Sequence, residues 1–342
     1  MNRRHFLRMA TLAGLATAGL GATACVQRTP SAAPAGSGSA AAGAKVTVGL
    51  TYTPDIQFSP FYVAAEKGYF KDAGLDVTLR HHGASESLFG AIQAGQEDIV
   101  YAGGDEMMQA RSQDVPLVNF ATYYQDYPVV LVVPEDSPIQ SAADLRGRSV
   151  GVPGPYGETW FGLLALLKQA GLAQTDVEVK HIGYTQQAAI TTKQVDAVMG
   201  YVNNDAVRLQ AAGVPVRTLP IAQADPPLVG IGLGTTDELL KTRQTELRKV
   251  HEAVVLAIAD IVADPDEAVR LSAKYVPGLN VGPQKESALA TLKATIPLFG
   301  EVGNYGRQNA ATWEAMAAFM GEMELLAKPV PAAEAYTADL VS

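Results

Sequence analysis

Residues 61–80 read FYVAAEKGYFKDAGLDVTLR, and this stretch decides the fold class. Apolar residues recur at helical spacing over 61–70, and apolar and polar residues alternate over 75–80, which predicts a helix followed by a strand. The pattern extends on both sides, with expected strands at 46–50, 99–102 and 117–123 and expected helices at 85–94 and 105–112. Strands that alternate with helices favour an α/β fold with a mainly parallel sheet.

A second series of strands and helices follows this unit. Its expected elements are strands at 129–133, 148–152, 177–182, 197–199 and 216–219 and helices at 137–145, 160–170 and 184–193. The chain then returns to an apolar strand at 229–233, and four helices are expected after it, at 237–264, 265–275, 283–295 and 309–326. This order predicts two lobes, one formed by 45–128 with 229–342 and the other by the inserted segment 129–228.

Composition separates the chain from several classes of protein. Hydrophobic residues make up 48% and charged residues 18% of the 342 residues, which is typical of a folded chain and not of a disordered one. The net charge is −9, and four of the 26 basic residues but none of the 35 acidic residues precede residue 45. The remainder therefore carries a net charge of −13, which argues against a nucleic-acid partner.

The first 24 residues have the layout of an export signal. Arg3, Arg4 and Arg8 precede a mildly apolar run over 9–20, and no acidic residue interrupts the segment. A helix that spans a membrane needs about 20 apolar residues, so this run of twelve is too short to be a lasting span. The stretch NRRHFLR at 2–8 resembles the twin-arginine export motif, and a general secretory signal is an equal alternative.

Cys25 is the single cysteine, so the chain has no intramolecular disulfide. It follows the small residues of Leu20-Gly21-Ala22-Thr23-Ala24, as the lipid-modified cysteine does in bacterial lipoproteins. Residues 25–44 are poor in charge and rich in Ala, Gly, Ser and Pro, which predicts a flexible tether. We therefore expect a lipid anchor at Cys25 that holds the protein on the extracytoplasmic face of the cell membrane. The alternative is an ordinary residue in a signal peptide that is cut further on.

Four segments carry a resemblance to a known family. Residues 61–77, 95–99 (GQEDI), 137–152 and 194–198 (QVDAV) resemble substrate-binding proteins of ABC importers of the thiamine-pyrimidine-precursor type. The resemblance covers about 45–233. It implies a two-lobed periplasmic-binding-protein fold of type II, the Venus-flytrap form, with a helical C-terminal part. It also implies that the protein closes on a small solute and delivers it to a membrane permease and its ATPase.

The resemblance extends to enzymes that make the thiamine pyrimidine, which carry a cysteine-rich motif and a substrate lysine. No cysteine follows Cys25, so we expect no enzymatic activity, no catalytic residues and no cofactor. No metal site is expected either, because the adjacent His81 and His82 lie on a strand and point to opposite faces.

Six loops are expected to line the cleft between the lobes: 52–62, 83–87, 103–106, 123–127, 154–160 and 200–205. None contains Lys or Arg, so an anionic solute is disfavoured. Their aromatic rings suit stacking on a flat heteroaromatic ligand, and their carboxylates and amides suit hydrogen bonds to it. The candidate ligand-binding residues are Tyr52, Asp55, Tyr62, Ser85, Glu86, Asp105, Glu106, Asp126, Tyr156, Glu158, Trp160, Tyr201 and Asn203.

Simpler roles stay open for several of these side chains. Glu86 and Glu158 could only complement helix dipoles, and Asn203 could only cap a helix. Phe58 and Phe61 from the first loop could simply pack in the core.

The segment GVPGPYGETW at 151–160 resembles the riboflavin-binding lipoprotein members of the family, so riboflavin is the expected solute. An aminopyrimidine precursor of thiamine is the alternative, although Tyr52 stands where thiamine-type relatives usually carry Trp. A tethered sensor or scaffold domain without a transported solute is a third possibility. The lobes are expected to close about hinges at 127–133 and 227–232.

Overall fold

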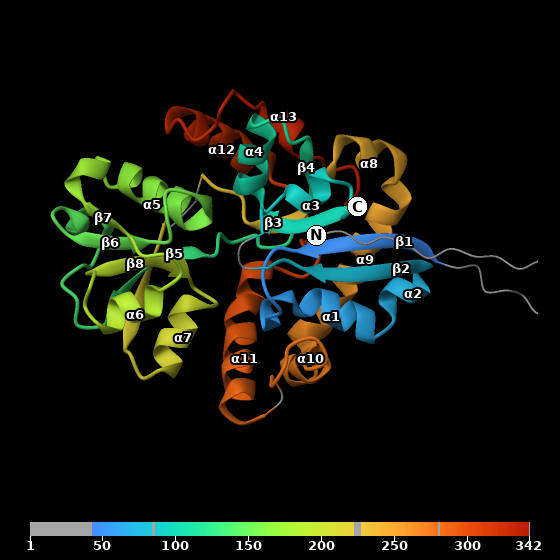
Figure 1. Cartoon of the computed structure of the whole chain (residues 1–342), viewed down its shortest axis with the longest axis horizontal. Coiled ribbons are helices and arrows are strands. Elements are labelled where there is room, and N and C mark those ends of the chain that lie inside the picture. Colours follow the sequence, from blue (N-terminus) through green and yellow to red (C-terminus); the bar gives the residue numbers. More distant parts are fainter. Residues whose placement is uncertain (1–42, 84–85, 222–226, 280, 342) are drawn as a thin grey trace, which may run out of the picture. The chain divides into compact units, whose positions relative to one another are not determined.

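The computed structural model describes residues 43–83, 86–221, 227–279 and 281–341 (Figure 1). The predicted signal at 1–24, Cys25 and nearly all of the tether at 25–44 lie outside these residues. Within the described part of the chain, none of the helices combines the length and the apolar character needed to cross a membrane.

Five strands form the first sheet, in the order β2-β1-β3-β10-β4. They are β1 (Ala44–Leu50), β2 (Leu75–His81), β3 (Ile99–Gly103), β4 (Leu117–Thr122) and β10 (Ile231–Thr236). Strand β1 pairs in parallel with β2 and β3, whereas β10 is antiparallel to both β3 and β4. Every residue of β3 and β4 is buried, which explains why their sequences are continuous apolar runs with few polar residues.

The second sheet has the order β7-β6-β8-β5-β9. Its strands are β5 (Val129–Pro134), β6 (Ser149–Val152), β7 (Glu178–His181), β8 (Ala197–Tyr201) and β9 (Val216–Pro220). Strand β6 is parallel to β7 and β8, and β5 is antiparallel to β8 and β9.

The expectation of mainly parallel sheets is therefore wrong in detail, because both sheets are mixed. The two strands that run against their neighbours, β5 and β10, are those that follow a crossover from one sheet to the other. A strand that enters a sheet through such a crossover, without a covering helix before it, is free to pair in the antiparallel sense.

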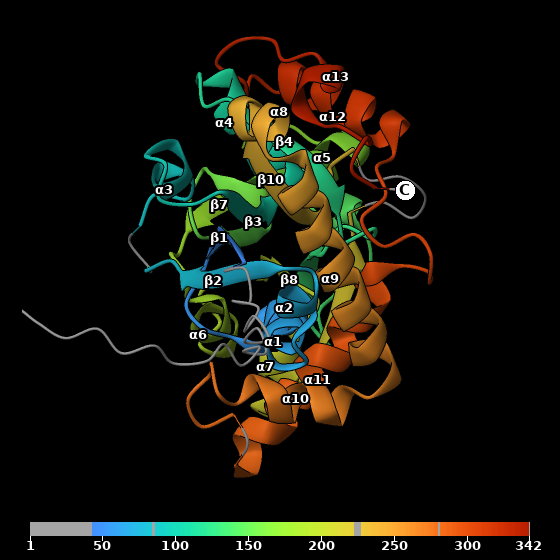
Figure 2. The ribbon, with the colours of Figure 1, turned by 90° about the vertical axis from the view of Figure 1, so that its right-hand side faces the viewer.

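Helices cover both sheets. They are α1 (Ser59–Glu66), α2 (Tyr69–Asp72), α3 (Gly90–Gln93), α4 (Gly104–Ser112), α5 (Gly157–Gln169), α6 (Gln186–Thr191), α7 (Asp205–Ala211), α8 (Asp237–Thr242), α9 (Gln244–Ala263), α10 (Pro265–Ser272), α11 (Gly282–Thr295), α12 (Ala310–Glu322) and α13 (Ala332–Ala335), with 3-10 turns at Ile56–Phe58, Ala142–Leu145, Gln174–Asp176 and Ile296–Phe299. In Figure 1, α5 covers one face of the second sheet and α6 and α7 cover the other. Helix α11 lies beside both α10 and α7, so it contacts a helix that connects two strands of the second sheet, β8 and β9 (Figures 1 and 2).

Three predicted helices differ from the structure. The helix expected at 137–145 is reduced to the 3-10 turn Ala142–Leu145. The helix expected at 85–94 is confined to α3, because Glu86 turns back to pair with Arg80 at 2.5 Å and accepts a hydrogen bond from the Gly83 N–H. The helix expected at 237–264 is broken at Arg243, which separates α8 from α9. The Arg243 side chain reaches Asp98 and the backbone oxygen of Lys45, and these contacts tie the break to the first sheet.

Each sheet has its own apolar core. Leu50, Phe61 and Val254 are among the fully buried side chains between the first sheet and α1 and α9. The core of the second sheet, which includes Leu163 of α5 and Met199 of β8, also contains four side chains of α12. These are Trp313, Met316, Phe319 and Met320. The helix from the end of the chain thus completes the core of a sheet formed by residues 129–220.

Candidate functional site

A cavity of about 250 Å³ lies where segments from both sheets meet. Its lining begins at the carboxyl ends of strands: Tyr52 follows β1, Gly103 ends β3, Pro153 follows β6 and Tyr201 ends β8. Ligands in open α/β folds bind outside the carboxyl ends of parallel strands, where loops lead into helix N-termini. The position of this cavity makes it the candidate ligand site.

Tyrosines dominate the wall of this cavity. Tyr52, Tyr156 and Tyr184 are 40%, 50% and 69% exposed, so their rings remain open to a ligand, while the lining residues Tyr101 and Tyr124 are buried. The ring of Tyr156 lies against the backbone of Gly154, since a Cβ at that glycine would fall 2.3 Å from the ring. Exposed rings held in this way offer surfaces for offset or edge-to-face stacking on a planar ligand.

Three carboxyl groups meet at one side of the cavity. Asp105 and Glu106 lie in the first turn of α4 and Glu158 in the first turn of α5, where the helix dipole favours acidic side chains. A Cβ on Gly103 would fall 2.5 Å from Asp105 Oδ1 and 2.8 Å from Glu158 Oε1, and one on Gly157 would fall 3.3 Å from Glu106 Oε1. The two glycines therefore give the carboxyl groups the space that a side chain would occupy. We call Asp105, Glu106 and Glu158 the carboxyl triad.

Hydroxyl and backbone donors hold the carboxyl triad in place. The Tyr127 hydroxyl donates to Asp105 Oδ2 at 2.6 Å, and the Glu106 N–H donates to Asp105 Oδ1 at 2.7 Å. The Tyr201 hydroxyl donates to Glu158 Oε2 at 2.5 Å. Tyr127 precedes β5 and Tyr201 ends β8. Tyrosines at the second sheet therefore bind carboxyl groups on α4, which follows β3 of the first sheet, and on α5, which follows β6 of the second sheet.

The carboxyl triad is difficult to ionise. Burial raises the pKa of Asp105 to about 7, and burial with the repulsion of Asp105 raises the pKa of Glu106 to about 8. Burial and the charges of Asp105 and Glu106 raise the pKa of Glu158 well above its usual range. Near neutral pH the carboxyl triad consequently retains protons, and it can both donate and accept hydrogen bonds.

The cavity wall contains one cationic side chain. The prediction of a lining without Lys or Arg is therefore wrong in this respect. Arg208 of α7 lines the cavity, and it is the only Lys or Arg among the described lining residues. Its guanidinium donates to Asp55 Oδ2 at 2.9 Å, so its charge is compensated by a residue that follows β1. The pair joins α7 of the second sheet to the first sheet across the cavity.

Five of the predicted site residues line the cavity: Tyr52, Glu106, Tyr156, Glu158 and Tyr201. Asp105 lies directly behind them in the carboxyl triad, and Asp55 reaches the cavity through Arg208. Ser85 lies outside the described residues.

Five other candidates lie elsewhere and correct the sequence prediction. Tyr62 is buried and stacks on Tyr275 with ring centroids 4.4 Å apart, and Trp160 packs against the core of the second sheet. Asn203 is buried and donates to Thr295 Oγ1 at 2.9 Å. Asp126 is exposed on a loop outside the cavity lining.

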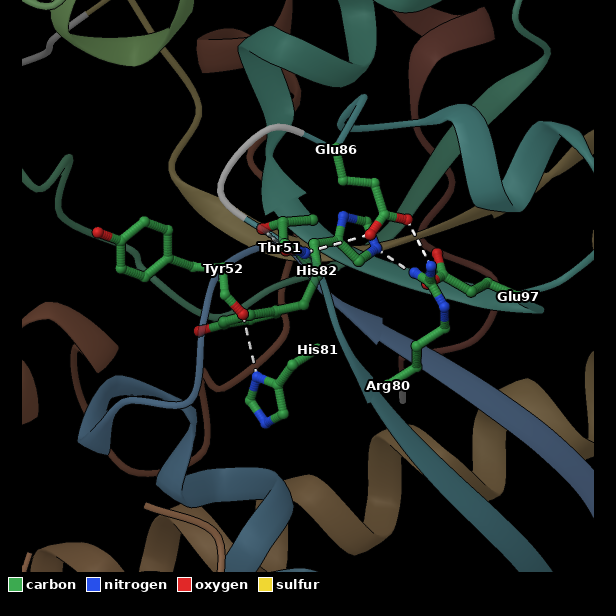
Figure 3. Close-up of polar contacts among 9 residues, drawn as sticks. Thr51, Tyr52, Arg80, His81, His82, Glu86 and Glu97 are labelled. Atoms are coloured by element: carbon green, nitrogen blue, oxygen red, sulfur yellow. Dashed lines mark hydrogen bonds and ion pairs between the residues drawn. The ribbon is translucent and has the colours of Figure 1, made fainter. Parts of the chain in front are cut away.

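Glu86, the fifth, belongs to a second charged cluster beside the cavity (Figure 3). Glu97 Oε1 accepts from Arg80 at 2.7 Å and from His82 at 2.9 Å, and Arg80 also pairs with Glu86. We call Arg80, His82, Glu86 and Glu97 the paired cluster. The neighbouring His81 turns away from it toward the backbone oxygen of Tyr52, so the two imidazoles contact different partners as strand geometry predicts.

Sequence reasoning missed Tyr184 and Arg208. Tyr184 follows β7, so the rule that loops after strands line the cleft applies to it. The sequence pattern instead predicts a helix from residue 184, whereas the helix begins at Gln186. No sequence signal marks Arg208, which lies one turn into α7 and reaches the cavity from there.

The chain is similar to known proteins over most of its length. The family model described as NMT1/THI5 like matches residues 55–268. The chain is 32% identical to riboflavin-binding protein RibY of Chloroflexus aurantiacus over 87% of this chain and 86% of that protein. It is 25% identical to a formylaminopyrimidine-binding protein of Halalkalibacterium halodurans over 85% and 89% of the two chains.

Among solved structures, the alkanesulfonate-binding protein SsuA of Xanthomonas axonopodis pv. citri superimposes with a TM-score of 0.68. Its sequence is 18% identical, and the match covers 87% of this chain and 99% of that one. This likeness concerns the fold. The predicted α/β, two-lobed periplasmic-binding-protein fold is confirmed.

Proposed function

The chain belongs to the NMT1/THI5-like family, and on this premise we propose that it is the solute-binding component of an ABC importer for riboflavin. In this role it binds the vitamin on the extracytoplasmic side and delivers it to a permease and its ATPase. The observation that carries the proposal is the combination of open tyrosine rings and buried carboxyl groups at one cavity, in a chain similar over most of its length to a riboflavin-binding protein.

The isoalloxazine ring of riboflavin suits this cavity chemically. It is flat and uncharged, and its edge carries carbonyl acceptors and an N–H donor. Stacking on the exposed rings of Tyr52, Tyr156 and Tyr184 would contribute about 0.5–1.5 kcal/mol per ring pair beyond the burial of area. The absence of an unpaired cation among the described lining residues disfavours the phosphorylated vitamin, because a phosphate would meet the carboxyl triad.

An aminopyrimidine is the second candidate solute. Its exocyclic amine is a donor that the carboxyl triad could accept, and a formylaminopyrimidine-binding protein is among the relatives. A pyrimidine-synthesising enzyme is a weaker reading, since no cysteine follows Cys25 and the cavity offers stacking surfaces and hydrogen bonds without a nucleophilic thiol. A sensor that passes no solute to a permease would bind the same ligand and would differ only in its partner.

Attachment to the membrane is part of the proposal. Acyl chains on Cys25 and a tether over 25–44 would hold the folded part near the permease while it captures its solute. Two lobes, 45–128 with 229–342 and 129–228, would close about hinges at 127–133 and 227–232. Metabolic labelling with palmitate tests the anchor. The proposal requires that the wild type incorporates the label and that Cys25→Ala does not.

A titration tests the solute. The protein is unfolded, freed of any carried-over ligand and refolded, and then titrated with riboflavin while the flavin fluorescence is followed. The expected result is saturable one-to-one quenching that weakens in Tyr156→Ala, with no saturation by flavin mononucleotide. Binding of formylaminopyrimidine but not of riboflavin would indicate that the same site serves thiamine salvage. Binding of neither compound would overturn the proposal that the ligand is a flat ring.

A further inference from the structure

One buried oxygen of the carboxyl triad, on a residue that lines the cavity, has no hydrogen-bond partner within the described residues. Glu158 is 4% exposed, lines the cavity, and its Oε1 makes no hydrogen bond within the described residues. A buried polar atom without a partner costs about 1–3 kcal/mol, so such atoms in a binding cavity are usually completed by the ligand. The other oxygen, Oε2, is already engaged by the Tyr201 hydroxyl.

The hydrogen bonds decide which carboxyl group keeps a proton. Both oxygens of Asp105 accept hydrogen bonds, from the Tyr127 hydroxyl and from the Glu106 N–H, which stabilises the ionised form. Glu158 receives only one donor. No ion pair within the described ranges joins Asp105, Glu106 or Glu158 to a cation, so the three groups cannot all ionise.

The position of the proton on Glu158 follows from its neighbour. Because Oε2 accepts the hydrogen bond from Tyr201, the carboxyl proton belongs on Oε1, the oxygen that has no other partner. Burial and the charges of Asp105 and Glu106 raise the pKa of Glu158 in the same direction. Glu158, a lining residue of the cavity, therefore carries an O–H donor and not a carboxylate.

We propose that Glu158 binds the ligand as a neutral carboxylic acid and donates a hydrogen bond from Oε1 to a ring carbonyl. The inference rests on the proposed function, and it requires a flat heteroaromatic ligand that carries a hydrogen-bond acceptor at its edge, such as a lactam or imide carbonyl. Isoalloxazines belong to this class. The ring nitrogens of an aminopyrimidine can accept the same hydrogen bond, so this donor alone does not separate the two candidate solutes.

Ligand binding is then linked to pH. Loss of the proton would place a carboxylate against the carbonyl oxygen of the ligand, so the affinity falls about tenfold for each pH unit above the point where Glu158 ionises in the free protein. The titratable groups that face Glu158 belong to the surrounding elements of both sheets, and they are Tyr101, Asp105, Glu106, Tyr124, Tyr127 and Tyr201.

The test compares dissociation constants of the full-length protein for riboflavin, measured by calorimetry from about pH 6 to about pH 9. In Glu158→Gln the amide oxygen can accept from Tyr201 while the NH₂ group takes the place of the O–H donor. This variant should bind riboflavin with an affinity that no longer varies with pH, whereas Glu158→Ala should bind at least about tenfold more weakly at low pH. The exposed Asp126→Asn serves as a control that keeps the wild-type pH profile.

Glu106→Gln sharpens the test. Removal of this neighbouring acid lowers the pKa of Glu158, so the affinity should begin to fall at a lower pH than in the wild type. A wild-type affinity that is flat with pH, or equal losses in Glu158→Gln and Glu158→Ala, would overturn the inference while riboflavin binding itself stood. Failure of the wild type to bind riboflavin at any pH would instead overturn the proposed function.

Discussion

Two groups of acidic side chains lie near the cavity and face opposite electrostatic conditions. In the paired cluster, Glu97 is fully buried but accepts hydrogen bonds from Arg80 and His82. In the carboxyl triad, Glu158 is similarly buried and meets only a tyrosine hydroxyl and two other acids. Removing a partner from a compensated carboxylate of the first kind is costly, whereas an uncompensated acid of the second kind costs stability unless it stays protonated. The contrast lies in charge compensation, since one oxygen of each acid, Glu97 Oε2 and Glu158 Oε1, has no hydrogen-bond partner within the described residues.

The largest expected effect breaks the paired cluster. Glu97→Ala leaves Arg80 and His82 without their shared acceptor, and loss of one partner of a buried pair costs about 3–5 kcal/mol. Because Arg80 is about a third exposed, we expect a loss near the lower end, about 3 kcal/mol, in urea unfolding. Glu267→Ala, which removes a surface pair with Arg270, is the control and should leave the stability close to that of the wild type. Equal losses in both variants would remove the distinction.

The next effect concerns the pH dependence of stability in the carboxyl triad. The folded pKa values of Asp105 and Glu106, about 7 and about 8, are raised above those of the unfolded chain. The unfolded chain therefore loses these protons first, and the free energy of unfolding falls as the pH rises from about 4.5 to about 8. We expect a decrease on the order of 3 kcal/mol in urea unfolding of the ligand-free protein. The double variant Asp105→Asn/Glu106→Gln should flatten this slope, and an unchanged slope would show that the triad does not cause it.

A smaller effect comes from filling the space between the acids. Gly103→Ala adds a Cβ within 2.5 Å of Asp105 Oδ1 and 2.8 Å of Glu158 Oε1, so the carboxyl groups must move apart. Overpacking of this kind costs about 1–3 kcal/mol, and riboflavin affinity should fall as well. Gly321→Ala provides the control, because a Cβ at Gly321 would meet nothing within 4 Å. Gly95→Ala would be unsuitable as a control, because the positive φ of Gly95 would strain an alanine. Retention of full affinity in Gly103→Ala would contradict the proposed geometry of the triad.

The smallest effect belongs to the pair at the cavity wall. Arg208 is half-exposed, so Arg208→Ala should change the free energy of unfolding by less than about 1 kcal/mol. Flavin mononucleotide should still not bind, because the variant removes the one described cation of the lining. The informative variant is Asp55→Asn, which frees the guanidinium and should allow measurable binding of the phosphorylated ring in the same titration. Continued rejection of the phosphate would show that Arg208 does not control charge selection.

Local sequence patterns predicted the secondary structure well. Each of the ten strands of the described chain overlaps a segment where an alternating or apolar run indicated a strand. Direction was not predictable in the same way, because β5 and β10 owe their antiparallel pairing to crossovers between distant segments. The helix break at Arg243 likewise depends on contacts with Asp98 and Lys45, about 150 and 200 positions away in the chain.

The site was predictable only in outline. The rule that loops after strands line the cleft correctly selected segments that contain Tyr52, Glu106 and Glu158. It could not distinguish a tyrosine that faces the cavity, such as Tyr156, from one that stacks in the interior, such as Tyr62. The convergence of the carboxyl triad depends on how α4 and α5 are placed by two different sheets, and no spacing along the chain encodes this.

The packing of α12 also constrains when the protein can finish folding. The side chains that fill the core of the second sheet come from residues 313–320, almost a hundred positions after the last strand of that sheet. During synthesis, the nascent second sheet therefore lacks part of its hydrophobic interior until nearly the whole chain has left the ribosome. The order of translation thus delays the compact state of the second sheet until the end of synthesis.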